Sequence, residues 1–192
     1  MSICRLGDHP LRIAELVAVA RHGARVKLAP KLVAKLGIAR GAIEQALARG
    51  EKVYGLTTAL GAAVDTALDA TDLADFQRRT LRARMVGVGD ALPKEATRAL
   101  LIARLAGLAR GASGISPSIP QAIADLLNAG VTPVVPAIGS LGAADLAPLA
   151  HAFAVLAGEG EAEFKGRVLP GLEALASAGL SPVVLGPKDA IA

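Results

Sequence analysis

Aromatic residues are almost absent from this sequence. They make up 2% of the 192 residues, whereas hydrophobic residues make up 53%, and tryptophan does not occur. The core must therefore be built from alanine, leucine, valine and isoleucine. Because alanine and leucine are among the strongest helix formers, this composition predicts a mainly α-helical protein. Proteins that bind nucleic acids commonly stack bases on aromatic side chains, so the scarcity of aromatics also argues against a nucleic-acid partner.

The features of secreted, membrane and metal-binding proteins are also lacking. The single cysteine, Cys4, excludes an internal disulfide framework and favours a reducing compartment. The chain does not open on an apolar segment of signal-peptide type, and the apolar run over 146–158 is too short to span a bilayer. No spacing of histidine, cysteine and aspartate indicates a metal site. We therefore expect a cytoplasmic protein that holds no metal and does not enter a membrane.

The formal net charge of +4 is modest, and its densest contribution is the cluster Arg78, Arg79, Arg82 and Arg84. On a helix these arginines spread around much of the circumference. A solvated helix face is the simplest interpretation, since a nucleic-acid site needs a broader basic surface.

Helical patterns recur along the chain. They predict helices over 11–22, 30–49, 72–86, 93–109, 118–129, from 142–145 to about 157, and 171–178. Ser118 and Gln121 have the spacing of a capping box for the fifth of these helices. Two prolines predict an extended segment over 131–140, and 161–170 has the pattern of two short strands joined by a turn. Glycines and threonines predict a loop over 51–65.

Four motifs follow one another in a specific order. They are VYGLTTALG at 53–61, GLARGASGISP at 107–117, LLNAGVTPVVPAIGSLGAADLAPLAH at 126–151 and GEGEAEFKG at 158–166. Together they resemble the aromatic amino-acid ammonia-lyases, which act on histidine, phenylalanine or tyrosine. The resemblance implies the N-terminal portion of a mainly helical, fumarase/aspartase-like fold. It also implies an N-terminal helical domain over 1–110, and a segment over 111–192 that carries the reactive loop and begins a truncated central helical region.

The resemblance also implies a chemistry. In this family an Ala-Ser-Gly tripeptide cyclises and loses water, which gives a methylidene-imidazolone electrophile made from the backbone itself. No separate cofactor is bound. The electrophile turns the substrate amino group into a leaving group, a base removes a β-proton, and ammonia departs to leave an α,β-unsaturated acid.

The motif of this chain departs from that tripeptide. The family pattern is Gly-Ala-Ser-Gly-Asp, whereas this sequence reads Gly142-Ala143-Ala144-Asp145 and is one residue shorter. Alanine has no hydroxyl to lose as water, and the nitrogen that would close the ring belongs to Asp145. The positions of the electrophile are Ala143, Ala144 and Asp145, but this peptide cannot form it.

Three further site positions are implied by the same resemblance. Tyr54 stands at the catalytic tyrosine, with a loop-anchoring tyrosine as the alternative. Gly61 closes the same loop, and Thr57 replaces a usual asparagine. Arg84 occupies a substrate-contacting position and is suited to a carboxylate, although a solvated helix residue is the preferred interpretation. We expect His151 to be a packed or hydrogen-bonded structural histidine.

Two functions of different classes remain open. The first is an ammonia-lyase that acts on a small aromatic amino acid, in the homotetramer typical of the family. The second is a catalytically inactive relative or split subunit, which acts as a binding or assembly module and completes its helices against a complementary C-terminal chain. A free-standing helical domain left by gene decay is a weaker third possibility. The later catalytic residues of the family are absent from this sequence, and a truncated bundle would expose apolar stripes.

Overall fold

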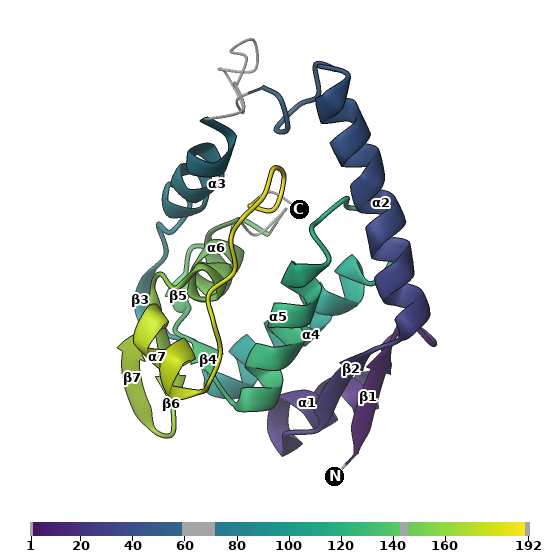
Figure 1. The fold of residues 1–192 in the computed structure, drawn as a ribbon. Helices are drawn as coiled ribbons and strands as arrows, with labels where there is room; N and C mark the ends of the chain where they lie inside the picture. Colours follow the sequence, from purple (N-terminus) through teal and green to yellow (C-terminus); the bar gives the residue numbers. More distant parts are fainter. Residues whose placement is uncertain (1, 59–71, 143–145, 191–192) are drawn as a thin grey trace.

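The computed structural model describes residues 2–58, 72–142 and 146–190 of the chain (Figure 1). The fold is mainly helical, as the composition predicts. Its helices are α1 (Ile13–His22), α2 (Pro30–Ala48), α3 (Asp72–Arg82), α4 (Lys94–Leu108), α5 (Ser118–Ala129), α6 (Leu146–Ala154) and α7 (Gly171–Ser177). A 3-10 turn over Val155–Ala157 continues α6. Among the described residues, no helix is long and apolar enough to cross a bilayer.

Short strands hold the helices together at three places. The strands β1 (Ile3–Leu6) and β2 (Arg25–Leu28) pair in parallel, and β3 (Val88–Ala91) pairs antiparallel with β5 (Pro136–Ile138). The third sheet has the order β4 (Thr132–Pro133), β6 (Glu161–Phe164) and β7 (Arg167–Pro170). The predicted strand pair over 161–170 is therefore confirmed. The strands β1, β2 and β3 were not predicted, because each is short and none is joined to its partner by a tight turn, unlike β6 and β7. In addition, β3 buries none of its residues.

The helix ends explain most of the predicted boundaries. The helix α2 begins at Pro30, which fits the first helical position. The helix α5 ends at Gly130, whose φ of 78° lies in the left-handed region that glycine adopts without strain. The predicted capping box at its start is wrong. Pro117 is the N-cap there, and the Gln121 amide instead donates a hydrogen bond to Asp125 one turn along the helix.

The core centres on α4 and α5. Leu101, Leu105 and Ile102 of α4 and Ile123 and Leu126 of α5 have no exposed surface. The helix α4 packs against both α1 and α5, so it forms the middle of the described structure (Figure 1).

The buried arginine Arg98 ties these three helices together. It is 6% exposed, and its guanidinium donates hydrogen bonds to the carbonyls of Val19 and Ala20 in α1 and of Leu127 in α5. These carbonyls lie near the ends of their helices, where intrahelical partners run out. Burial lowers the pKa of Arg98 from its ordinary value.

The arginines of α3 lie mainly in solvent. Arg78, Arg79 and Arg82 are each exposed over more than half of the side chain, in agreement with the predicted solvated face. Arg82 also makes two hydrogen bonds to the Glu159 carboxylate, at 2.8 and 2.9 Å. The arginine cluster therefore also has a structural role, because Arg82 connects α3 to the loop before β6.

We expect Arg98→Met to lower the free energy of unfolding by about 2–4 kcal/mol, because it leaves buried carbonyls without donors. Chemical denaturation followed by circular dichroism measures this change. Arg110→Met is the matched control, since Arg110 is exposed just beyond the end of α4; it should change the value by less than about 0.5 kcal/mol. Equal effects of the two substitutions would contradict a bridging role for Arg98.

Candidate functional site

The longest motif, at 126–151, runs from the end of α5 through β4 and β5 to α6, and the described part of its motif loop is 139–142. Gly142 has a φ of 80°, and its amide donates a hydrogen bond of 3.1 Å to the Ser140 hydroxyl. The Ser140 side chain therefore holds the backbone at the start of the loop. Leu141 at the loop tip is 92% exposed. The predicted site residues Ala143, Ala144 and Asp145 lie outside the described residues, as does Gly61.

The position of the motif loop is set where the backbone at Gly139 passes close to the backbone at Gly87. A Cβ atom on Gly139 would lie 3.1 Å from Gly87 Cα and 3.3 Å from the Cβ of Ala147. Contacts this short need glycine at position 139, where φ is also +155°. The pairing of Val88 with Ile138 in β3 and β5 holds the two segments in this register. The start of the motif loop is therefore fixed against the segment that follows α3.

His151 of α6 makes the polar contact in this region. Its Nε2 atom accepts a hydrogen bond of 3.1 Å from the Gly87 amide. Burial lowers the pKa of His151 from its ordinary value, which favours the neutral ring. A neutral ring that accepts at Nε2 carries its proton on Nδ1. His151 is thus a structural histidine, as predicted, and it anchors α6 to the backbone beside the motif loop.

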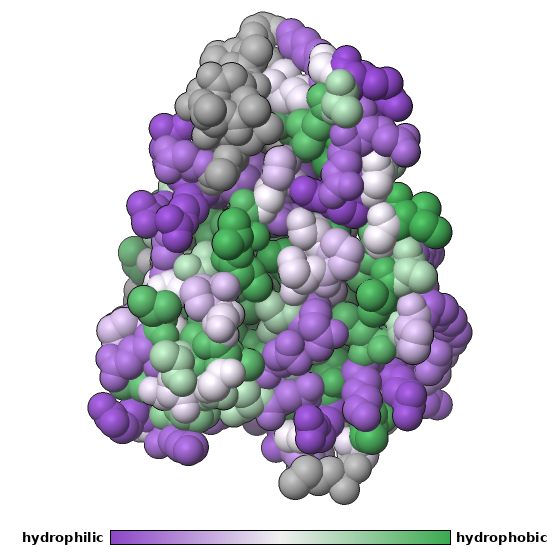
Figure 2. Space-filling model, in the orientation of Figure 1, coloured by the Kyte–Doolittle hydropathy of each residue, from purple (hydrophilic) through white to green (hydrophobic). Residues whose placement is uncertain are grey.

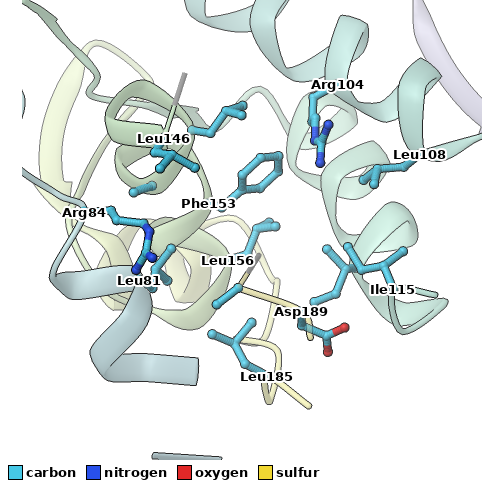
Figure 3. A pocket seen from close by; sticks show the side chains of 14 residues that line it. Leu81, Arg84, Arg104, Leu108, Ile115, Leu146, Phe153, Leu156, Leu185 and Asp189 are labelled. Carbon is cyan, nitrogen blue, oxygen red and sulfur yellow. The ribbon is translucent and has the colours of Figure 1, made fainter. Parts of the chain in front are cut away.

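Arg84 is less solvated than predicted. It follows the end of α3, is half-buried, and donates a hydrogen bond of 2.8 Å to the Thr80 carbonyl. Its side chain lines a cavity of about 210 Å³ enclosed by α3, α4, α6 and the C-terminal segment (Figure 3). The interpretation of Arg84 as a solvated helix residue is therefore wrong, because Arg84 is half-buried and lies beyond the end of the helix. A substrate role for Arg84 stays a prediction.

The cavity contains residues that the motifs did not single out. Its walls are mainly apolar, and the charged side chains that reach it are Arg84, Arg104 and Asp189. Arg104 lies three residues after the buried Leu101, on the same face of α4. Arg98 and Arg104 are both charged residues within the largely apolar pattern of α4, a signal that the sequence already carried.

Tyr54 lies in a separate turn. The Thr57 hydroxyl donates to the Glu51 carbonyl at 2.6 Å and accepts from the Val53 amide at 2.8 Å, so it ties this turn together. Tyr54 itself is 57% exposed. It is not among the residues that line the cavity beside Arg84, so the described structure does not bring Tyr54 and Arg84 into one pocket.

The part of the chain that the structure describes contains no cluster of side chains suited to bind a metal ion. No three histidine, cysteine, aspartate or glutamate side chains lie together there in a way that would hold a metal ion. The buried Cys4 has a pKa raised above its ordinary value by burial and by Glu15, so its thiol form is favoured. Neither observation points to a second reactive centre.

Comparison with known proteins matches almost the whole chain. The family described as aromatic amino acid lyase matches residues 11–192. The histidine ammonia-lyase of Paracidovorax citrulli (strain AAC00-1) is 42% identical over 187 residues, which are 96% of this chain and 36% of that protein. The histidine ammonia-lyase of Streptomyces griseus is 44% identical over 180 residues, which are 93% of this chain and 35% of that protein.

Solved structures agree on the fold. The crystal structure of ergothionase from Treponema denticola, in complex with desmethyl-ergothioneine sulfonic acid, matches with a TM-score of 0.95 and 31% identity. The match covers 99% of this chain and 38% of that one. The chain thus spans a little over a third of the length of these relatives.

The neutral, buried His151 predicts a pH-dependent stability. Its pKa in the folded state lies below the ordinary value of 6.5, so the unfolded state takes up the proton first as the pH falls. The neutral His151 ring therefore contributes fully to the free energy of unfolding above this pH, and its contribution decreases as the pH falls below it. We expect a lower free energy of unfolding at about pH 5.5 than at about pH 7.5, and a smaller difference in His151→Gln, whose amide oxygen can still accept from Gly87. Denaturation at both pH values measures this. His22→Gln, an exposed control, should keep the full difference.

Proposed function

Because this chain belongs to the aromatic amino-acid lyase family, we propose that it is the N-terminal part of an ammonia-lyase-type protein of the histidine class. The reaction is the removal of ammonia from a small aromatic amino acid to leave an α,β-unsaturated acid. Histidine is the first substrate to test. The observation that carries this proposal is the identity of 42–44% to histidine ammonia-lyases over more than nine tenths of the chain.

The geometry around the motif supports this proposal. The backbone of the loop approaches Gly87, and His151 anchors α6 beside it. Arg84 lies three residues before Gly87 in the sequence, and its side chain lines the neighbouring cavity. A guanidinium in an apolar setting suits the carboxylate of an amino acid.

The electrophile implied by the family does not fit the residues present. Its formation needs a side chain that loses water and an unhindered nitrogen that closes the ring. The sequence offers Ala144, whose methyl group has no leaving group, followed by the nitrogen of Asp145. We therefore derive no catalytic step through that group for this chain.

This misfit favours a second candidate function. A chain that keeps the framework and lacks the dehydratable serine fits a binding or assembly subunit without lyase activity of its own. Such a subunit would pair with further copies, as in a family-type tetramer, or with a complementary C-terminal chain. Homologous proteins extend well beyond the matched region, since this chain covers 35–36% of their length.

Intact mass and product formation distinguish the two candidates. A chain that makes the electrophile weighs two waters less than its sequence, one lost in ring closure and one from the serine side chain, and changes mass again after borohydride. With histidine, an active chain gives the unsaturated acid, seen as a rise in near-ultraviolet absorbance. We expect the full sequence mass and no product from the chain alone. A mass two waters lower would show that the electrophile forms after all, and would favour the enzyme.

A restored tripeptide is the matched test of the framework. The variant carries Ala144→Ser with one glycine inserted before Asp145, which recreates Gly-Ala-Ser-Gly-Asp. If the framework is that of a lyase, part of this variant should lose two waters, because the inserted glycine closes the ring and serine now supplies the leaving hydroxyl. The same insertion without Ala144→Ser is the control and should keep its full mass. Retention of the full mass by both variants would count against a framework competent for cyclisation.

A further inference from the structure

The described side chains of α3, from Asp75 onward, attach this helix through a largely polar face. Gln77 and Thr80 are buried on this face beside Leu81, with exposed fractions of 0, 5 and 4%. The Gln77 Oε1 atom accepts a hydrogen bond from the Ala190 amide, but the Nε2 atom is buried without a partner in the described structure. A buried polar group that lacks a partner costs stability. This face therefore stabilises α3 less than the buried face of α4, which is built mostly of leucine and isoleucine.

The helix α3 also lies at the edge of the molecule. It packs mainly against one helix, α6, whereas α4 packs against both α1 and α5 (Figure 1). Figure 2 shows hydrophilic residues along the upper left edge, where α3 lies in Figure 1, and Arg78, Arg79 and Arg82 are exposed. Segments with few buried apolar contacts open locally at a lower free-energy cost than the core. We expect α3 to be such a segment.

A single carboxylate, that of Glu159, holds α3 in place. Arg82 donates hydrogen bonds from Nε and Nη2 to its two oxygens, at 2.8 and 2.9 Å. Arg78 Nε lies 3.7 Å from the same carboxylate. Bidentate pairs of this kind are stronger than single contacts, and the Glu159 side chain is only 17% exposed. The contribution of this cluster should therefore exceed that of an ordinary surface ion pair.

The backbone around Glu159 is fixed independently of α3. The Glu159 amide donates a hydrogen bond of 2.9 Å to the Ala154 carbonyl, and the Gly171 amide donates one of 2.8 Å to the Gly160 carbonyl. A side chain at position 171 would collide with the Glu159 carbonyl, so the two segments are in direct contact. Because the acceptor is already ordered, the arginines bind it at a lower entropic cost.

The chain after α3 is fixed at a separate point. The Gly87 amide is bound to His151, and β3 is paired with β5. The helix α3 can therefore turn away from α6 about the segment 83–86 without breaking the strand pair. Leu81 at the end of α3 and Arg84 just after it line the cavity of about 210 Å³ (Figure 3). Movement of α3 thus removes one wall of this cavity.

We propose that α3 is a gate of the cavity, which the ion pairs of Arg78 and Arg82 with Glu159 hold closed. When salt screens these pairs, α3 turns away and the cavity opens toward solvent. Ionic strength controls the gate because the Arg82 side chain is 62% exposed and counter-ions reach it. The inference rests on the proposed function only where it makes this cavity the place of an amino-acid substrate.

Hydrogen exchange of the full chain, followed by mass spectrometry, tests the gate. We expect the α3 amides to exchange faster than those of α4 and α5, and about threefold faster in about 1 M than in about 0.05 M sodium chloride. Glu159→Gln should accelerate the α3 amides about tenfold and remove most of the salt dependence, because a neutral amide cannot pair with two guanidinium groups. Exchange in α4 and α5 should change little.

Glu163→Gln is the matched control. Glu163 lies on β6 and pairs with Lys94 at 2.7 Å, so this substitution removes another ion pair without touching α3. Exchange in α3 should stay as in the unsubstituted chain. A charge exchange completes the set: Glu159→Arg combined with Arg82→Glu should give slower α3 exchange than Glu159→Arg alone, because only the combination restores an attraction at this point.

Access to the cavity is measured with a buried thiol. Ala150 of α6 lines the cavity and is 4% exposed, and Cys4→Ser removes the natural cysteine. In this background we expect Ala150→Cys to react with a thiol reagent about tenfold faster once Glu159→Gln is added. Ala124→Cys is the control, because Ala124 of α5 is fully buried and does not line the cavity. Its reaction should not accelerate.

Three results would overturn the gate. They are exchange in α3 no faster than in α4, equal acceleration of all helices by Glu159→Gln, and an unchanged thiol reaction of Ala150→Cys when Glu159→Gln is added. The second result would mean general destabilisation, and the third would mean that α3 moves without opening the cavity. None of these measurements depends on electrophile or product formation, so the gate and the lyase proposal fail independently of each other.

Discussion

The hydrogen bond from the Gly87 amide to His151 Nε2 is the contact on which the motif region depends. It joins the segment after α3 to α6, and the loop between β5 and α6 must then pass against Gly87. That passage is possible because position 139 is a glycine. A side chain at either glycine would push β5 away from β3 or displace His151. The arrangement is therefore specified by a neutral imidazole and two residues without side chains, and it needs none of the chemistry of the loop that it positions.

Two arginines on α4 show how burial of the same group leads to opposite outcomes. Arg98 and Arg104 lie six residues apart, and burial lowers the pKa of both. Arg98 finds four acceptor contacts on helix carbonyls and so links α1, α4 and α5. Arg104 faces a cavity and has a buried Nε atom without a partner. A buried charge costs stability unless it is paired. Arg98 is buried and paired with carbonyls, whereas Arg104 is half-buried and lines the cavity.

Much of this fold was predictable from local pattern. Most helices begin and end close to where proline, glycine and the apolar period indicate, although α3 ends at Arg82 and not at 86. The strand pair over 161–170 follows from its turn. The pairing of β1 with β2 was not predictable, because it joins four-residue strands separated by α1. The capping box failed for a related reason. Pro117 caps α5, and Gln121 finds a better partner in Asp125, a choice that spacing alone does not reveal.

The site was predictable in its motifs and less so in its contacts. The order of the four motifs led to the family, and His151 has the structural role expected of it. The burial of Arg84 depends on how α3 ends against α6, which lies beyond any local pattern. Arg104 was visible as a charge in the apolar pattern of α4, but its place in the cavity wall depends on the approach of α6 and the C-terminal segment.

Framework and chemistry are separable in this protein. The contacts that place the loop involve backbone atoms, glycines and His151, and none of them requires a serine at position 144. A lineage can therefore lose the dehydratable residue and keep the geometry, because stability does not depend on the residue that reacts.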